Sequence, residues 1–355
     1  MRLAFLGTPA FAVPTLERMV EAGHTVLAVV TQPDRPRGRG QTPAASPVKE
    51  AALRLGLPVY QPERVRRPEA VEYLRALAAD AMVIVGYGQI IPQSVIDLVP
   101  MGIINVHASL LPKYRGAGPI QWAIIRGETR TGVTTMRIDA GLDTGDMLLV
   151  AETEIAPGEN AVDLGRRLAV MGAELLVETL AGLAAGAIVP RKQDSTQATY
   201  APLLKKEDGL IDWSQAASSI HNRVRGLQPW PGAYTIFRGQ TLHIWASQVL
   251  SPNATSFARG ADPPVRGGRP RPPFCIEPQL DSIGESGSGG TRADRGVRPT
   301  NRGHVITSRP LLIACGEGAL ELLEVQLEGR KRMSAADFAN GQRLSENEIL
   351  GEPRT

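Results

Sequence analysis

The first 200 residues alternate short apolar runs with amphipathic helical stretches, and this alternation constrains the fold more than any other feature. Five runs have the continuously apolar, β-branched character of buried strands: Arg2–Leu6, Thr25–Thr31, Ala81–Val85, Gly102–His107 and Gly132–Ile138. Helical stretches lie between these runs, among them Ser46–Gly56, Pro68–Ala79 and Pro119–Gly127. Apolar strands that alternate with helices are typical of a parallel sheet covered on both faces. The sequence therefore predicts a doubly wound, Rossmann-like α/β domain over residues 1–200.

The character of the sequence changes after Tyr200, where residues 201–210 resemble a linker. Short strand-like pieces separated by turn residues follow over residues 211–345, and this pattern favours a small β-barrel of OB-like type. Residues 251–303 interrupt it with a segment rich in glycine, proline and arginine. Such a composition cannot bury enough apolar surface to offset the entropy of ordering. We expect a disordered insertion in a surface hairpin, and contact of its arginines with RNA stays an open alternative.

Composition and cysteine content exclude several classes of protein. The chain is 43% hydrophobic and 21% charged with a formal net charge of +3, which permits an anionic partner without requiring one. Two cysteines, Cys275 and Cys315, provide neither a disulfide framework nor a thiolate metal cluster. The apolar run Leu3–Leu6 is shorter than the roughly 7–15 residues of an export signal. We therefore expect a cytoplasmic protein.

A pair of polar side chains marks the end of one predicted strand. Asn105 and His107 close the run Gly102–His107 and point to the same side, because side chains of a strand repeat every two residues. Ligands of doubly wound sheets bind beyond the carboxyl ends of the strands. The glycine fingerprint of dinucleotide-binding proteins and the P-loop are both missing after the first strand, which continues as "GTPAFA". The sequence thus predicts a ligand site here and disfavours a nicotinamide oxidoreductase.

Carboxylates are available for the same site. Asp139, Asp143 and Asp146 crowd the glycine-rich turn "RIDAGLDTGDMLL" between two predicted strands. An amide, an imidazole and a carboxylate suit acyl transfer, in which one group binds a developing oxyanion, one moves a proton and one orients the imidazole. From the residues alone, a hydrogen-bonded strand end and ordinary turn chemistry remain open as alternatives.

Longer motifs narrow these alternatives. The strings "NVHASLLPKYRGAGPIQWAI" and "TGVTTMRIDAGLDTGDML" resemble the formyltransferases that use 10-formyltetrahydrofolate. "TQPDRPRGRG" and "NRVRGLQPWPGAY" are similar to the branch of this family that acts in translation initiation. The resemblance covers roughly residues 1–250 and 304–350. It implies transfer of a formyl group from 10-formyltetrahydrofolate to the α-amino group of methionine on initiator tRNA, without a metal.

The resemblance also implies roles for individual residues. The catalytic trio of the family falls on Asn105, His107 and Asp143. We expect Asn105 to donate to the formyl oxygen and His107 to stabilise the intermediate while moving a proton, with Asp143 orienting His107 or a neighbouring water. Folate binding is implied for two segments, the tetrapeptide and the strand end that contain Ser109, Leu110, Leu111, Pro112, Gly86, Gly88, Gln89 and Ile90. Ala108 stands where many relatives have glycine.

A basic turn provides the candidate contact with tRNA. Arg35, Arg37 and Arg39 alternate with proline and glycine, and the resemblance implies that this loop grips the acceptor end of initiator methionyl-tRNA. Arginine contacts with phosphates supply affinity without sequence readout. Two further basic clusters could extend this surface or simply be solvated: Lys205, Lys206, Arg330, Lys331 and Arg332. We expect a monomer.

Two rival functions fit part of the pattern. A relative with the same chemistry could formylate a ribonucleotide amine or a nucleotide-sugar amine, or pass the formyl group to water, but should lack the arginine loop and the second domain. A non-catalytic RNA-binding protein on an inactive transferase fold would bind tRNA without turnover.

Overall fold

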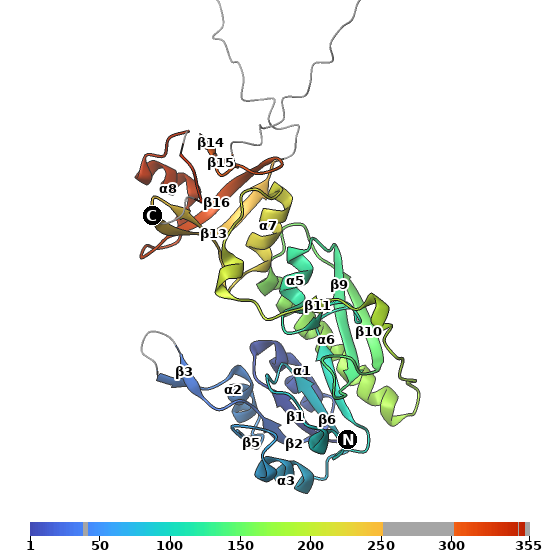
Figure 1. The fold of residues 1–355 in the computed structure, drawn as a ribbon. Coiled ribbons are helices and arrows are strands. Elements are labelled where there is room, and N and C mark those ends of the chain that lie inside the picture. Colours follow the sequence, from blue (N-terminus) through green and yellow to red (C-terminus); the bar gives the residue numbers. More distant parts are fainter. Residues whose placement is uncertain (38–41, 251–301, 347, 352–355) are drawn as a thin grey trace, which may run out of the picture.

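The computed structural model describes residues 1–37, 42–250, 302–346 and 348–351. Figure 1 shows an N-terminal and a C-terminal domain, each built around its own β-sheet and placed end to end. The predicted disordered insertion at residues 251–303 lies almost entirely outside the described residues.

The N-terminal sheet has seven strands in the order β10, β9, β7, β6, β1, β2, β5. Their bounds are β1 Arg2–Gly7, β2 Thr25–Val30, β5 Val59–Tyr60, β6 Ala81–Val85, β7 Ile103–His107, β9 Arg130–Arg137 and β10 Met147–Glu154. From β7 through β6, β1 and β2 to β5, each strand pairs in parallel with its neighbour. The predicted Rossmann-like parallel sheet is confirmed for these five strands.

The other two strands run in the opposite direction. β9 pairs antiparallel with β7, and β10 pairs antiparallel with β9, so the expectation of a wholly parallel sheet is wrong at this edge. Only residues 138–146 join β9 to β10, and a parallel crossover needs a dozen or more residues. The short connection therefore folds back, and it carries Asp143 toward the end of β7.

Helices cover both faces of this sheet. Along β1, Leu3 and Phe5 pack into one core and Ala4 and Leu6 into another, as the two-residue period of a strand requires. The first core includes helices α1 Val13–Glu21, α2 Pro47–Arg54, α5 Pro119–Ile125 and α6 Ala161–Ala184. The second core includes helices α3 Pro68–Ala76 and α4 Gln93–Ile96. A 3-10 turn, η1 Ala10–Ala12, leads into α1.

The start of α2 is stabilised by a capping side chain and by a proline in its first turn. Ser46 is its N-cap and accepts a hydrogen bond from the backbone N–H of Lys49 at 3.1 Å, and Pro47 occupies the first turn. Before α2, strands β3 Arg35–Arg37 and β4 Thr42–Ala44 form an antiparallel hairpin that projects from the domain in Figure 1. The predicted arginine loop thus has paired strands at its base.

The chain between α6 and the second domain returns across the first. Within this connector, η2 spans Ser195–Gln197, and β11, Tyr200–Ala201, pairs in parallel with β8, Arg115–Gly116. The predicted linker 201–210 begins in that strand pair and continues through the 3-10 helix η3, Lys206–Gly209. The connector is therefore attached to the loop that follows β7.

The C-terminal domain has a sheet in the order β12, β13, β16, β15, β14, and β17 pairs with β16. Its elements are α7 Ala217–Gly226, β12 Ala233–Phe237, β13 Gln240–Val249, β14 Val305–Ser308, β15 Leu311–Ala314, β16 Ala319–Leu327, β17 Met333–Ser334 and α8 Ala335–Gln342. A separate sheet domain is confirmed. In the part of the chain that the structure describes, no pairing joins β12 to β14, so a closed, OB-like barrel stays a prediction.

The two domains meet where α5 packs beside α7. Trp122 and Ile125 of α5 lie against the C-terminal core. Arg225 of α7 donates to the backbone carbonyl of Glu159, which precedes the N-cap of α6, over 2.8 Å. None of the helices in the described ranges is long and apolar enough to cross a membrane.

Candidate active site

Asn105 and His107 lie in the last three residues of β7, on the sheet face opposite α6. Val106, between them, packs against α6, where a Cβ added to Gly172 would lie 2.7 Å from a Val106 methyl. Asn105 is only 8% exposed and His107 only 6%. Among the described residues no side-chain hydrogen bond engages the Asn105 amide. This amide is therefore available to a ligand.

A backbone carbonyl fixes the orientation of His107. Its Nε2 lies 2.9 Å from the carbonyl oxygen of Tyr114. A carbonyl only accepts hydrogen bonds, so Nε2 carries the proton and Nδ1 is the nitrogen left for chemistry. Tyr114 has a left-handed backbone, with φ of 62°. Its hydroxyl donates to Glu128 over 2.7 Å, and burial, with that carboxylate, raises the pKa of the phenol.

Asp143 approaches the free nitrogen of His107. Its Oδ2 lies 3.7 Å from His107 Nδ1, which is longer than a hydrogen bond, and accepts the backbone N–H of Gly116 at 2.9 Å. Asp143 also has a left-handed backbone, with φ of 50°, a conformation that is uncommon outside glycine and clusters at functional sites. The carboxylate is thus aimed at the imidazole by its backbone.

The other carboxylates of this turn have different roles. Asp139 accepts hydrogen bonds from the backbone N–H of Gly141 and from the hydroxyl of Thr144, which is ordinary turn chemistry. The backbone carbonyl of Asp146 accepts from the N–H of Arg137. Of the three aspartates that the residues alone left open, the structure brings Asp143 to His107.

The predicted folate tetrapeptide forms a tight buried turn. Ser109 is fully buried, and its hydroxyl donates to the carbonyl of Lys113 at 2.6 Å. Thr134 of β9 donates to the Ser109 carbonyl and accepts from the Leu111 N–H, and the Leu111–Pro112 peptide is cis. Leu110 is partly exposed, whereas Leu111 is buried. The tetrapeptide shapes the wall beside His107, and its contact with folate stays a prediction.

The second predicted folate segment follows β6, next to β7. Ile84 of β6 pairs with Asn105, so the segment starts two residues from the site. Gly86 and Gly88 have positive φ, of 58° and 82°. The Gln89 side chain is bound to the backbone of Val65 and Glu63, which leaves its backbone as the group that could meet a ligand.

Ile90, in the same segment, is 91% exposed. Its apolar side chain is therefore exposed to solvent, next to a candidate ligand site.

The predicted tRNA residues lie in three places. Arg35 is exposed in β3, Arg37 closes that strand, and Arg39 lies outside the described residues. Lys205 and Lys206 are exposed at the start of η3. The third group, near the C-terminus, comprises the exposed side chains Arg330, Lys331 and Arg332.

Arg332 already has partners within the protein. It pairs with Glu324 at 2.5 Å and lies over the Trp245 ring, 5.0 Å from its centroid. Arg332 is thus less available to RNA than its neighbours in sequence.

Two residues that sequence reasoning missed complete the surroundings of Asp143. Arg115, which is 3% exposed, donates twice to the side-chain oxygen of Gln193, at 3.0 and 2.7 Å. The amide nitrogen of Gln193 donates to the carbonyls of Asp143 and Gly145, both at 2.8 Å. Arg115 lies within the motif quoted above, but Gln193 is fifty residues from Asp143 and carries no sequence signal.

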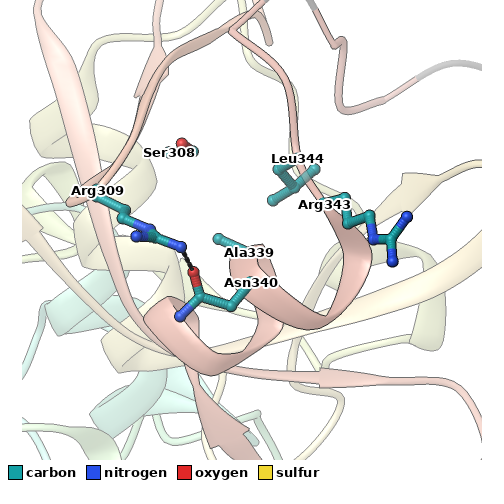
Figure 2. A pocket seen from close by; sticks show the side chains of 6 residues that line it. All are labelled: Ser308, Arg309, Ala339, Asn340, Arg343 and Leu344. Carbon is teal, nitrogen blue, oxygen red and sulfur yellow. Dashed lines mark hydrogen bonds between the residues drawn. The ribbon is translucent and has the colours of Figure 1, made fainter.

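A separate hollow of about 340 Å³ lies in the C-terminal domain, as Figure 2 shows. Arg309 donates to the Asn340 side chain there, and Arg343 points away from the other lining residues. The hollow therefore presents no set of converging groups. Within the described ranges, no group of three or more histidine, cysteine or acidic side chains is placed to hold a metal ion.

Comparison with known proteins identifies both domains. The Formyl transferase family model matches residues 1–180, and the Formyl transferase C-terminal domain model matches residues 203–270 and 279–343. The solved N-formyltransferase of Helicobacter canadensis, in complex with folinic acid and dTDP-3-aminofucose, has a TM-score of 0.54 at 19% identity. That match covers 70% of this chain and 87% of the other, and at this identity the likeness concerns the fold alone.

Relatives in sequence span both domains. The methionyl-tRNA formyltransferase of Solibacter usitatus (strain Ellin6076) is 68% identical over 352 residues, which is 99% of each chain. The methionyl-tRNA formyltransferase of Koribacter versatilis (strain Ellin345) is 51% identical over 354 residues, again 99% of each. With both domain models matched in order and relatives this similar along the whole length, the chain belongs to the methionyl-tRNA formyltransferase family.

Proposed function

We propose that this protein transfers the formyl group of 10-formyltetrahydrofolate to the α-amino group of methionine on initiator tRNA, at the site formed by Asn105, His107 and Asp143. The observation that supports this most is the approach of Asp143 to Nδ1 of His107 beside a free amide at the end of β7. An amide donor, an imidazole and a carboxylate at one strand end match the needs of acyl transfer.

The nucleophile needs little activation. A free α-amino group has a pKa of about 7.7–8.0, and esterification of the carboxyl group lowers it further, so much of the amine is neutral near pH 7. The harder task is to hold the amine against the formyl carbon and to stabilise the tetrahedral oxyanion. One well-aimed donor to an oxyanion contributes about 3 kcal/mol. Asn105, with its unengaged amide, is that donor.

His107 moves the proton. Because Nε2–H is bound to the Tyr114 carbonyl, Nδ1 accepts the proton that the attacking amine loses. The resulting imidazolium faces the Asp143 carboxylate at 3.7 Å, which stabilises its charge. The proton then passes to the folate nitrogen as the carbon–nitrogen bond breaks, and tetrahydrofolate leaves.

The two substrates are assigned to different segments of the chain. The folate is held by backbone groups of residues 86–90 and by the turn of residues 109–112. The acceptor end of tRNA is held by the arginine hairpin, and the exposed Lys205 and Lys206 of the connector are a second candidate contact. We further propose a catalytic domain over residues 1–200, a tRNA-binding domain over residues 211–345, and a monomer in the cytoplasm.

The direct test is incubation with labelled 10-formyltetrahydrofolate and methionyl initiator tRNA, scored against the elongator tRNA. Turnover should fall at least about a hundredfold in Asn105→Ala, His107→Ala and Asp143→Ala, with folding intact. His24→Ala, which removes an imidazole far from the site, is the control and should keep wild-type turnover. A His107→Ala enzyme with near-normal turnover would overturn the assignment.

The rival functions are separated by the same assay. Formylation of a ribonucleotide amine or a nucleotide-sugar amine in preference to methionyl-tRNA would favour another acceptor. Binding of tRNA with no turnover at any folate concentration would favour a non-catalytic RNA-binding protein.

A further inference from the structure

Arg115 is a buried cation with an unusual partner. Its side chain is 3% exposed, and both of its hydrogen bonds run to the neutral amide oxygen of Gln193. Within the described residues no carboxylate pairs with it. Burying a charge without an ionic partner costs free energy, and this cost indicates that Arg115 has a function beyond packing. Gln193 is the link between this charge and the rest of the site.

Both polar atoms of the Gln193 side chain take part in holding the turn that carries Asp143. Its oxygen accepts from Arg115, and its nitrogen donates to the carbonyls of Asp143 and Gly145 at 2.8 Å each. Two donated bonds to residues two apart fix the backbone of the turn on both sides of Thr144. This support is needed because Asp143 has the left-handed φ of 50°.

The tripeptide of residues 114–116, which includes β8, also holds the Asp143 carboxylate and the His107 imidazole. Gly116, next to Arg115, donates its N–H to Asp143 Oδ2, and Tyr114, on the other side, accepts from His107 Nε2. This tripeptide is in turn bound to the connector, since the N–H groups of Tyr114 and Arg115 donate to Thr199 at 2.9 and 2.8 Å. The connector therefore defines where Asp143 and His107 lie relative to each other.

We propose that Gln193 and Arg115 are positioning residues for the formyl transfer, which hold the Asp143 carboxylate opposite Nδ1 of His107. The inference rests on the proposed function of the trio. Gln193 acts through Asp143 and touches no substrate. Misplacing a catalytic group by about 1 Å costs on the order of a hundredfold in rate.

Gln193→Glu is the discriminating variant. A carboxylate at this position keeps the bonds to Arg115 and supplies the missing ionic partner, but it cannot donate to the carbonyls of Asp143 and Gly145. We expect the melting temperature to stay near that of the wild type while kcat falls about tenfold to a hundredfold and the KM for folate changes little. Gln240→Glu, at an exposed glutamine of β13 with no side-chain hydrogen bond among the described residues, is the control and should be unchanged.

A double variant tests whether Gln193 acts through Asp143. If it does, Gln193→Glu should cost less than about twofold more in an Asp143→Asn background, since coupled residues are non-additive. Wild-type kcat in Gln193→Glu, or a full multiplicative loss in the double variant, would overturn the positioning role alone. Wild-type kcat in Asp143→Asn would instead overturn the proposed trio, and the positioning role with it.

Discussion

At the scale of single residues, most polar groups of the site already form hydrogen bonds within the protein. Asn105 is the exception, because its amide has no side-chain partner in the described part of the chain, yet it is 8% exposed. The amide is not among the fully buried polar atoms without a partner, so it keeps contact with solvent, and a ligand can replace that water. Formyl oxygen is the acceptor that the proposed reaction places there.

Asn105→Asp tests the donor with almost no change of shape. The carboxylate cannot donate and repels the developing oxyanion, so kcat should fall about a hundredfold to a thousandfold. Single-turnover formylation of methionyl-tRNA measures this effect, and the KM for folate should stay within about twofold because only the transition state is affected. A loss confined to KM would show that Asn105 binds the ground state.

The residues of the site differ in how far sequence could predict them. The two-residue period of β7 places Asn105 and His107 on one face, so their shared direction follows from the chain alone. Spacing could not choose Asp143 over Asp139, because that choice depends on a left-handed backbone and on a bond from Gly116. Gln193 was beyond prediction, since only the tertiary fold brings it to the turn.

At the scale of elements, the alternation of strands and helices predicted most of the first sheet but not its edge. Apolar runs identify β9 as a strand but contain no information on its direction, which the short connection to β10 decides. The β8–β11 pair was also missed, because two residues per strand are too few for periodicity to register.

Gly116→Ala should break the β8–β11 pair. Gly116 has φ of 115°, and an added Cβ would lie 2.7 Å from the Ala201 carbonyl oxygen, a backbone atom that cannot turn aside. We expect turnover to fall at least about tenfold together with a loss of about 1–3 kcal/mol in unfolding free energy. Urea denaturation and the formylation assay measure the two effects. Gly186→Ala, where φ is 66° and no atom lies within 4 Å of the added Cβ, is a control for replacing a positive-φ glycine without a clash and should keep wild-type turnover.

Helix α7 introduces a dependence of stability on pH. Burial, with help from the nearby Arg225 cation, lowers the pKa of His221 below its ordinary value. The unfolded chain therefore binds the proton first, so this contribution to stability is full above about pH 6.5 and is lost as the pH falls toward the lower folded pKa.

Melting temperatures at about pH 7.5 and about pH 5.5 test this coupling. The decrease on acidification should be smaller in His221→Asn than in the wild type. Ser247→Ala, which removes the hydrogen-bond partner of His221 but keeps the imidazole, should retain the larger decrease. Equal decreases in all three proteins would contradict the role of His221.

At the scale of the whole molecule, the two substrates are assigned to different parts of the chain. The folate segments follow β6 and β7, whereas the arginine hairpin precedes α2. Arg39→Ala should therefore raise the KM for tRNA much more than the KM for folate, and should reduce the slope of log affinity against log salt by about 1. Steady-state kinetics across a salt series measure both. Equal effects on the two KM values would count against the hairpin.

The path of the connector has a practical consequence for dissecting the protein. Residues 193–201 look dispensable when the chain is divided after the last long helix, yet Gln193 and Thr199 support Asp143 and the loop beside His107. A fragment that ends at Gly186 would keep Asn105, His107 and Asp143 but would lack the contacts that position them. The smallest catalytic unit worth expressing alone therefore extends through Ala201, because a shorter fragment would lose the β8–β11 pair and the hydrogen bonds of Gln193 and Thr199.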